Sequence, residues 1–123
     1  RWAASTEPDG LRLAVTDTTR AICCESLANP GGVISDLEGI ARVAADADVP
    51  FIVDNTLATP YLLRPFEWGA HIVVHSATKF LGGHGNSLAG AIVEAGTFDE
   101  LVQAGGRFAN LARTQLIAPE PAA

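Results

Sequence analysis

The fold is decided by a run of apolar residues that does not alternate with polar ones, Val49-Pro50-Phe51-Ile52-Val53-Asp54. A strand with one face in water alternates apolar and polar side chains, whereas a strand covered on both faces is apolar throughout. A second run of this kind follows, His71-Ile72-Val73-Val74-His75-Ser76. The two runs predict neighbouring strands of a parallel sheet that is covered on both faces.

Helical patterns and further strands flank these runs. The spacing Ser-x-x-Glu in Ser35-Asp36-Leu37-Glu38 is that of a capping box and predicts a helix whose buried face carries Leu37, Ile40, Ala41, Ala44 and Ala47. A short helix is expected over residues 9–15, and a helical stretch interrupted by Pro65 over residues 62–68. Residues 20–25 and 87–94 are strand candidates. Strands that alternate with helices predict an α/β fold with a mainly parallel sheet flanked by helices.

Length and charge restrict the function classes. A chain of 123 residues with 48% hydrophobic and 18% charged residues is about one globular domain. Its formal charge of −6 disfavours nucleic acid and anionic membranes as partners, because both require clustered basic residues. The chain has no apolar run as long as a membrane helix and no secretory signal pattern at residues 1–4, so a cytoplasmic location is expected.

The metal-ligand residue types show no metal-binding spacing. Cys23 and Cys24 are adjacent in an apolar run and are interpreted as reduced packing residues. His71, His75 and His84 have no zinc-ligand arrangement, so structural or supporting roles are expected for them. No metal is expected.

Three of the predicted strands end in a polar residue, and these residues are Glu25, Asp54 and Ser76. In open parallel sheets the ligand crevice lies beyond the carboxyl ends of the strands. The pattern therefore predicts acid and hydroxyl groups along one edge of a single site. Any one of the three could instead be a residue at which the chain simply leaves the core.

Lys79 is the only lysine of the chain, and it follows Ser76 and Thr78 and precedes the glycine-rich turn Gly82-Gly83-His84-Gly85. A lysine amine can lose its proton, attack a carbonyl and hold a cofactor covalently, which an arginine cannot do. The alternative is an ordinary solvated charge. The glycines match neither the Walker phosphate loop nor the dinucleotide fingerprint.

A cofactor such as pyridoxal phosphate requires an amine for imine formation, donors for the phosphate and a carboxylate for the ring nitrogen. Lys79 supplies the amine, and Ser76 and Thr78 supply hydroxyl groups. Asp54 is placed to keep the pyridine nitrogen protonated. The sequence therefore favours pyridoxal 5'-phosphate as the cofactor.

These residues belong to a longer resemblance. The blocks Val53-Asp54-Asn55-Thr56, Ala58-Thr59-Pro60-Tyr61 and His75-Ser76-Ala77-Thr78-Lys79-Phe80-Leu81-Gly82-Gly83-His84-Gly85, with Glu25-Ser26-Leu27-Ala28-Asn29-Pro30 upstream, resemble the cysteine and methionine metabolism family of pyridoxal-phosphate enzymes. The resemblance runs from about residue 19 to residue 108. It implies a fold type I, aspartate-aminotransferase-type large domain.

The resemblance implies a role for each matching position. Lys79 would hold the cofactor as an imine and, once displaced by the substrate amine, move protons as a base. Asp54 would pair with the ring nitrogen, and Ser76 and Thr78 would bind the phosphate. Asn29 would approach the ring hydroxyl. Glu25 would support the site, or it would only bond nearby backbone.

Within the family, residues 79–87 and 64–70 are most similar to O-acetylhomoserine sulfhydrylases. The implied reaction is γ-replacement, in which acetate leaves O-acetylhomoserine and sulfide or a thiol takes its place, giving homocysteine or methionine. Cystathionine γ-synthase and γ-lyase activities use the same cofactor residues and remain alternatives.

Enzymes of this family are several times longer than this chain and are homodimers or homotetramers. Residues 1–108 are therefore expected to form part of the large cofactor-binding domain, and residues 109–123 a non-matching, flexible tail. The ring-stacking aromatic residue and the arginine for the substrate carboxylate would lie outside this chain. An isolated chain could thus be a non-catalytic α/β fragment or an interaction module.

Overall fold

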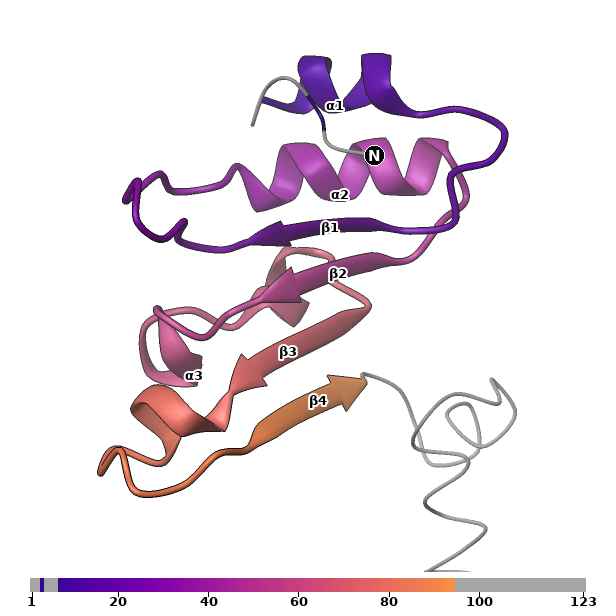
Figure 1. Cartoon of the computed structure of the whole chain (residues 1–123). Coiled ribbons are helices and arrows are strands. Elements are labelled where there is room, and N and C mark those ends of the chain that lie inside the picture. Colours follow the sequence, from indigo (N-terminus) through magenta and orange to yellow (C-terminus); the bar gives the residue numbers. More distant parts are fainter. Residues whose placement is uncertain (1–2, 4–6, 95–123) are drawn as a thin grey trace, which may run out of the picture. The chain divides into compact units, whose positions relative to one another are not determined.

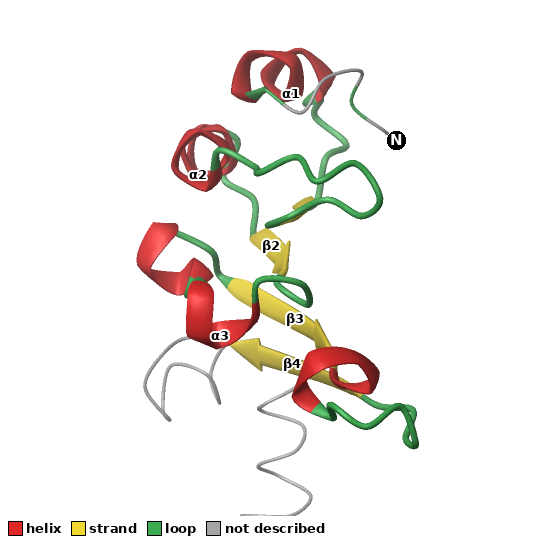
Figure 2. Cartoon of the chain, turned by 90° about the vertical axis from the view of Figure 1, so that its left-hand side faces the viewer, coloured by secondary structure: helices red, strands yellow, loops and turns green. Residues whose placement is uncertain are grey.

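The computed structural model describes Ala3 and residues 7–94, which form helices and a four-stranded sheet (Figure 1). The strands β1 (Ile22–Glu25), β2 (Phe51–Asp54), β3 (Ile72–Ser76) and β4 (Gly90–Glu94) neighbour one another in this order. β1, β2 and β3 are parallel, whereas the arrow of β4 points the opposite way in Figures 1 and 2. The prediction of an α/β fold with a mainly parallel sheet is confirmed.

The helices connect and cover these strands. α1 (Pro8–Ala14) packs on α2 (Leu37–Asp46), and α2 joins β1 to β2. The expected helical stretch over residues 62–68 is instead two short elements, α3 (Thr59–Leu62) and the 3-10 helix η1 (Pro65–Trp68). Pro65 begins η1 because a proline has no backbone N–H to donate and fits the first turn of a helix. Within the described residues, no helix has the length and hydrophobicity that a membrane crossing requires.

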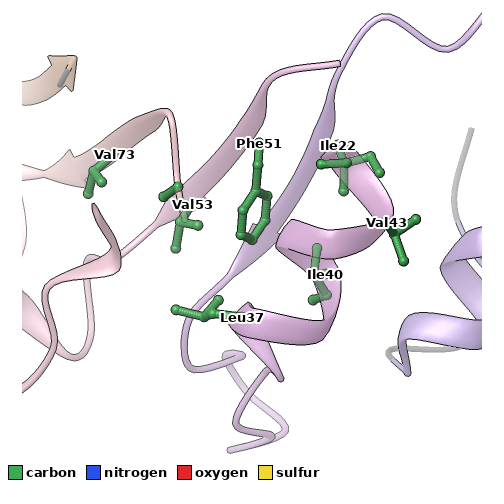
Figure 3. Close-up of a cluster of buried hydrophobic side chains, with 9 residues drawn as sticks. Ile22, Leu37, Ile40, Val43, Phe51, Val53 and Val73 are labelled. Carbon is green, nitrogen blue, oxygen red and sulfur yellow. The ribbon is translucent and has the colours of Figure 1, made fainter. Parts of the chain in front are cut away.

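The core lies between α2 and one face of the sheet (Figure 3). Phe51 and Val53 of β2 are fully buried there, and Ile40 and Val43 of α2 are 1% exposed. Burying side chains of this size stabilises the fold by roughly 1.5–3 kcal/mol each. The remaining buried members of the cluster are Ile22, Leu37, Ala44, Ala70 and Val73.

The opposite face of the sheet is less covered than the sequence predicts. Burial alternates along the strands, so that Ile52 and Val74 are half-buried and Cys23 is exposed. The expectation of strands buried on both faces is therefore wrong for the described part of the chain. The described residues leave the apolar side chains of this face partly exposed. The hydrophobicity of a strand does not by itself show how well each of its faces is covered.

The cap of α2 also differs from the prediction. Asp36, not Ser35, is the N-cap, and its Oδ1 accepts a hydrogen bond from Gly39 N at 2.9 Å. The Ser35 hydroxyl instead donates to the backbone oxygen of Glu25 at 2.6 Å. A Cβ atom at Gly39 would lie 2.5 Å from Pro8 Cγ, so glycine permits the close approach of α1 to the first turn of α2.

Replacement of the cap tests this assignment. Asp36→Ala is expected to lower the free energy of unfolding by about 1 kcal/mol, because it leaves a first-turn N–H without its acceptor. Glu38→Ala, the change that a capping box would make costly, is expected to lose no more than about 0.5 kcal/mol, because Glu38 only pairs with Arg42 on an exposed surface. Urea denaturation measures both values, and a larger loss for Glu38→Ala would contradict the assignment.

The two cysteines are free thiols on opposite faces of β1. Burial raises the pKa of the Cys24 thiol to about 11, although a hydrogen bond with Ser35 lowers it in part. Desolvation also raises the pKa of Cys23, and the negative charges of Asp54 and Glu25 raise it further. Both thiols are therefore protonated near neutral pH. The interpretation as packing residues suits Cys24, which is half-buried, but is wrong for Cys23, which is exposed.

Alkylation with iodoacetamide should follow this shift. In a Cys23→Ala variant, Cys24 is expected to react roughly 100-fold more slowly at pH 8 than in the unfolded chain, because two pKa units remove about that much thiolate. Its rate should rise about tenfold per pH unit up to about pH 11. The pKa of the Cys24 thiol is higher in the folded chain than in the unfolded chain. The contribution of this thiol to the free energy of unfolding is therefore fully present below about pH 9 and is lost as the pH rises through 11. Equal rates in the folded and unfolded chains would contradict the burial of Cys24.

Candidate functional site

Strand alternation sends adjacent polar residues to opposite sides of the sheet. Glu25 and Asp54 are register partners at the ends of β1 and β2, on the less covered face, and Ser76 at the end of β3 has the same orientation. The next residues in the chain, Ser26 and Asn55, are buried on the core side at 2% and 0% exposure. The polar residues at the strand ends are thus divided between the two faces. Glu25, Asp54 and Ser76 lie on the less covered face, whereas Ser26 and Asn55 lie on the core side.

A cavity of about 470 Å³ lies at these strand ends, a size typical of small-molecule sites. Four of the five predicted cofactor-binding residues line it, together with Glu25 and Thr56. The polar and charged lining residues are Glu25, Asn29, Asp54, Thr56, Ser76 and Lys79. The polar residues at the ends of β1, β2 and β3 thus line one cavity.

Lys79 lies in η2 (Ala77–Leu81), directly after β3, and is the one cation among the described residues that line this cavity. Its side chain is exposed and forms no ion pair with the described residues. Arg12, Arg42 and Arg64, in contrast, each pair with a surface carboxylate. The amine is therefore available to a molecule in the cavity.

A tight turn holds Lys79 at the cavity. Gly83 N donates to the Lys79 carbonyl at 2.8 Å, and Gly82 N donates to the Ala77 carbonyl at 2.7 Å. A Cβ atom at Gly82 would lie 2.6 Å from that Ala77 oxygen. The first glycine after Phe80-Leu81 is therefore required by the close return of the backbone.

The carboxylate of Asp54 is held by Thr56. Asp54 Oδ1 accepts hydrogen bonds from Thr56 N at 2.9 Å and from the Thr56 hydroxyl at 2.5 Å. The same hydroxyl accepts a hydrogen bond from Ser76 N at 2.8 Å. Asp54 Oδ2 has no hydrogen-bond partner in the described part of the chain and so can accept from a bound ligand.

The loop after β1 forms another wall of the cavity. Glu25 Oε2 accepts a hydrogen bond from Asn29 N at 2.9 Å, and the Asn29–Pro30 peptide bond is cis. Glu25 thus bonds nearby backbone, as one of its two interpretations proposes, and also lines the cavity. The Asn29 side chain is exposed at the cavity.

Thr78 is the predicted site residue that does not line the cavity. Its hydroxyl donates to the Ala89 carbonyl at 3.2 Å and accepts from Ala89 N at 3.0 Å. These bonds fasten η2 to the segment that leads into β4. Sequence spacing does not reveal that the Ala89 backbone binds the Thr78 hydroxyl, because the two residues are distant in the chain.

Sequence reasoning assigned no role to Thr56, Ser26 or Asn55. The Ser26 hydroxyl donates to Asn55 Oδ1 at 2.8 Å, and Asn55 Nδ2 donates to the Leu63 carbonyl at 2.8 Å. The Asp-x-Thr spacing of Asp54 and Thr56 is a local signal for such a contact, because an aspartate often bonds the backbone two residues later. The Ser26–Asn55 pair has no local signal.

The histidines contribute no metal site among the described residues. His71 Nδ1 accepts a hydrogen bond from Phe51 N at 3.0 Å, which is a structural role. His75 is buried on the core side of β3, and its Nδ1 has no partner in the described part of the chain. His84 is exposed in the glycine-rich turn.

Two relatives place this arrangement among known enzymes. A sulfhydrylase of Fusarium oxysporum is 54% identical over 87 residues, covering 70% of this chain and 20% of the relative. An L-methionine gamma-lyase of Pseudomonas putida is 51% identical over 83 residues, covering 68% of this chain and 21% of the relative. The chain thus spans about a fifth of the length of these relatives.

A solved structure agrees with the fold. The crystal structure of a protein assigned as an O-acetylhomoserine (thiol)-lyase from Campylobacter jejuni matches with a TM-score of 0.71 and 40% identity. The match covers 77% of this chain and 24% of that one, and that protein carries a pyridoxyl-lysine monophosphate. The predicted fold type is therefore confirmed.

The family is decided by the match over almost the whole chain. The model of the Cys/Met metabolism PLP-dependent enzymes matches residues 1–118. The relatives agree with that match, and the pyridoxyl-lysine of the solved structure agrees with pyridoxal phosphate as the cofactor of the family. The chain belongs to the Cys/Met metabolism family of pyridoxal-phosphate-dependent enzymes.

Proposed function

We propose that these residues are the cofactor-binding segment of an enzyme that replaces the acetate of O-acetylhomoserine by sulfide or a thiol, giving homocysteine or methionine. The observation that carries the proposal is the convergence of Lys79, Asp54 and Ser76 on one cavity. The similarity to a sulfhydrylase and to an O-acetylhomoserine (thiol)-lyase supports this substrate class.

The groups of the cavity fit pyridoxal phosphate. Asp54 offers one carboxylate oxygen that the described residues leave without a partner, and Lys79 offers an amine outside any ion pair with them. When bound, the cofactor supplies an aldehyde that forms imines with amines and a ring that stabilises negative charge next to the imine. We assign residues 1–108 to part of the large cofactor-binding domain; residues 95–108 of this range and the predicted tail over residues 109–123 lie outside the described residues.

Each lining residue has a proposed task. Lys79 Nζ holds the cofactor covalently and, when free, takes the proton from the substrate Cα. Asp54 Oδ2 accepts the ring N–H, and the Ser76 hydroxyl donates to a phosphate oxygen. The Asn29 amide donates to the ring hydroxyl. Glu25 holds the loop of Asn29 through the bond to its backbone N–H.

Thr78 requires a change of partner to reach the phosphate. Its single hydroxyl proton is used by the Ala89 carbonyl, so donation to phosphate replaces that bond. Its backbone N–H also donates to Ala89, at 3.1 Å. We therefore propose Ser76 as the principal hydroxyl ligand and Thr78 as a second one that exchanges Ala89 for phosphate.

The described part of the cavity is incomplete for an anionic substrate. It contains the carboxylates of Glu25 and Asp54 and a single cation, Lys79, which is committed to the cofactor. Cationic partners strengthen the binding of a phosphate and of a substrate carboxylate, because hydrogen bonds between charged groups are the strong ones. We propose that these come from the rest of a complete chain or from a second copy in a homo-oligomer.

The covalent step is tested by trapping. A complete chain that contains these residues is mixed with pyridoxal phosphate, reduced with borohydride and mapped by mass spectrometry. Labelling confined to Lys79 is expected, and labelling elsewhere or none would contradict the proposal. The same experiment on the present chain alone distinguishes a binding segment from a non-catalytic fragment.

Product analysis distinguishes the members of the family. With O-acetylhomoserine and sulfide, homocysteine and acetate are expected in equal amounts. Cystathionine formed from cysteine would support a cystathionine γ-synthase. An α-keto acid formed without added nucleophile would support a γ-lyase, the activity named for the Pseudomonas relative.

A further inference from the structure

The hydroxyl of Thr56 lies between two residues that serve different ends of the proposed cofactor site. It donates to Asp54 Oδ1 at 2.5 Å and accepts from Ser76 N at 2.8 Å. The backbone N–H of Thr56 adds a second hydrogen bond to the same carboxylate oxygen, at 2.9 Å. One residue therefore contacts both the carboxylate at the end of β2 and the backbone at the end of β3.

These contacts restrict how Asp54 can turn. Both donors act on Oδ1, so rotation of the carboxylate would break two hydrogen bonds at once. Oδ2 is left as the oxygen without a partner in the described part of the chain, and Asp54 lines the cavity. Hydrogen bonds to a charged group are roughly twice as strong as those between neutral groups.

The contact with Ser76 restricts the second strand end. The register of β2 with β3 ends at Asp54 and Val74, and beyond it the Thr56 hydroxyl, not a backbone carbonyl, accepts the hydrogen bond of Ser76 N. This bond fixes the backbone from which the Ser76 hydroxyl and then Lys79 project. A β-branched threonine has a restricted side-chain rotation, which favours holding both contacts together.

We infer that Thr56 is a positioning residue that couples the ring-nitrogen end of the cofactor site to its phosphate end. The inference rests on the proposed function, because it assigns Asp54 to the ring nitrogen and Ser76 to the phosphate. Thr56 acts on the cofactor through these two residues. In this role the Thr56 hydroxyl donates a hydrogen bond to Asp54 Oδ1 and accepts one from Ser76 N.

The test measures cofactor binding by a complete apo-protein that contains these residues. Thr56→Val keeps the shape and the backbone N–H but removes the hydroxyl, and it is expected to weaken the affinity for pyridoxal phosphate about tenfold. Thr56→Ser keeps the hydroxyl and is expected to stay within about threefold of the parent. Thr56→Ala, with the same expectation as Thr56→Val, replaces it if the valine variant does not fold.

A double-mutant cycle with Asp54→Asn shows whether Thr56 acts through Asp54. The effect of Thr56→Val is expected to shrink from about tenfold to under about threefold in the Asp54→Asn background, because coupled residues are not additive. The magnetic resonance chemical shift of the cofactor's isotope-labelled ring nitrogen should differ from that of the parent in Thr56→Val and equal it in Thr56→Ser. A role confined to folding would move neither quantity.

The outcomes separate this inference from the proposed function. If Asp54→Asn changes neither the affinity nor the ring-nitrogen shift, the assignment of Asp54 is wrong and the proposed site fails with it. If Asp54→Asn changes both but Thr56→Val changes neither, the positioning role of Thr56 is wrong and the proposed function stands. Equal effects of Thr56→Val in both backgrounds would also overturn the inference.

Discussion

Replacement of Lys79 by alanine is expected to lower the activity of the complete enzyme by at least about 10³-fold, because the amine that attacks the cofactor aldehyde and moves protons is lost. No borohydride-stable adduct should form. The cofactor should still bind reversibly, since Asp54 Oδ2 and the Ser76 hydroxyl remain at the cavity. Activity and adduct mass are measured on the same preparation.

Two further variants separate amine chemistry from charge. Lys79→Arg keeps the positive charge but cannot form an imine, so it should be as inactive as Lys79→Ala. Arg42→Ala removes a cation whose carboxylate partner, Glu38, is exposed, and activity should be unchanged. If Lys79→Arg retained the activity, Lys79 would act through its charge only; if Lys79→Ala retained it as well, Lys79 would be an ordinary solvated charge.

Replacement of Asn55 by alanine is expected to lower the free energy of unfolding by about 2–4 kcal/mol. Asn55 is fully buried, accepts from the Ser26 hydroxyl and donates to the Leu63 carbonyl. The alanine variant leaves the buried Ser26 hydroxyl and the half-buried Leu63 carbonyl without these partners and creates a void, and these costs add. Urea denaturation measures the loss of free energy of unfolding, first in the apo-protein and then in the presence of pyridoxal phosphate.

A matched asparagine serves as the control. Asn86 is exposed, and the one hydrogen bond of its side chain with the described residues is accepted from the Ser87 hydroxyl at 3.3 Å. Asn86→Ala should change the free energy of unfolding by less than about 0.5 kcal/mol. Equal losses for the two variants would show that the buried bonds of Asn55 contribute no specific stability. Asn55 also separates Asp54 from Thr56 in the chain, so its loss should weaken cofactor binding as well.

The strands could be predicted because their signal is local. The runs ending at Glu25, Asp54 and Ser76 are confirmed as β1, β2 and β3, and each ends at the predicted polar residue. Parallel pairing follows from connecting helices such as α2, so the convergence of these ends could be inferred as well. Neither inference required knowledge of long-range side-chain contacts.

Two hydroxyl contacts that the sequence does not reveal depend on residues that are distant in the chain. Ser35 does not cap α2, because its hydroxyl donates a hydrogen bond to the Glu25 carbonyl instead. The backbone bridge between Leu27 and Ile34 brings Ser35 close to Glu25. The Thr78 hydroxyl likewise donates to the Ala89 carbonyl, a contact that the spacing of Ser76, Thr78 and Lys79 does not reveal. In both cases a competing backbone group, and not a wrong residue type, decides the outcome.

The sequence by itself determined the strands, the helix between β1 and β2, the single amine and the family pattern, because each depends on residue type and short spacing. Tertiary structure alone decided that Thr56 joins Asp54 to Ser76, that Asn55 bonds Ser26 and that Thr78 turns to Ala89. A hydroxyl or amide has few hydrogen-bonding positions, and which neighbour fills them depends on where the folded backbone places competing donors and acceptors.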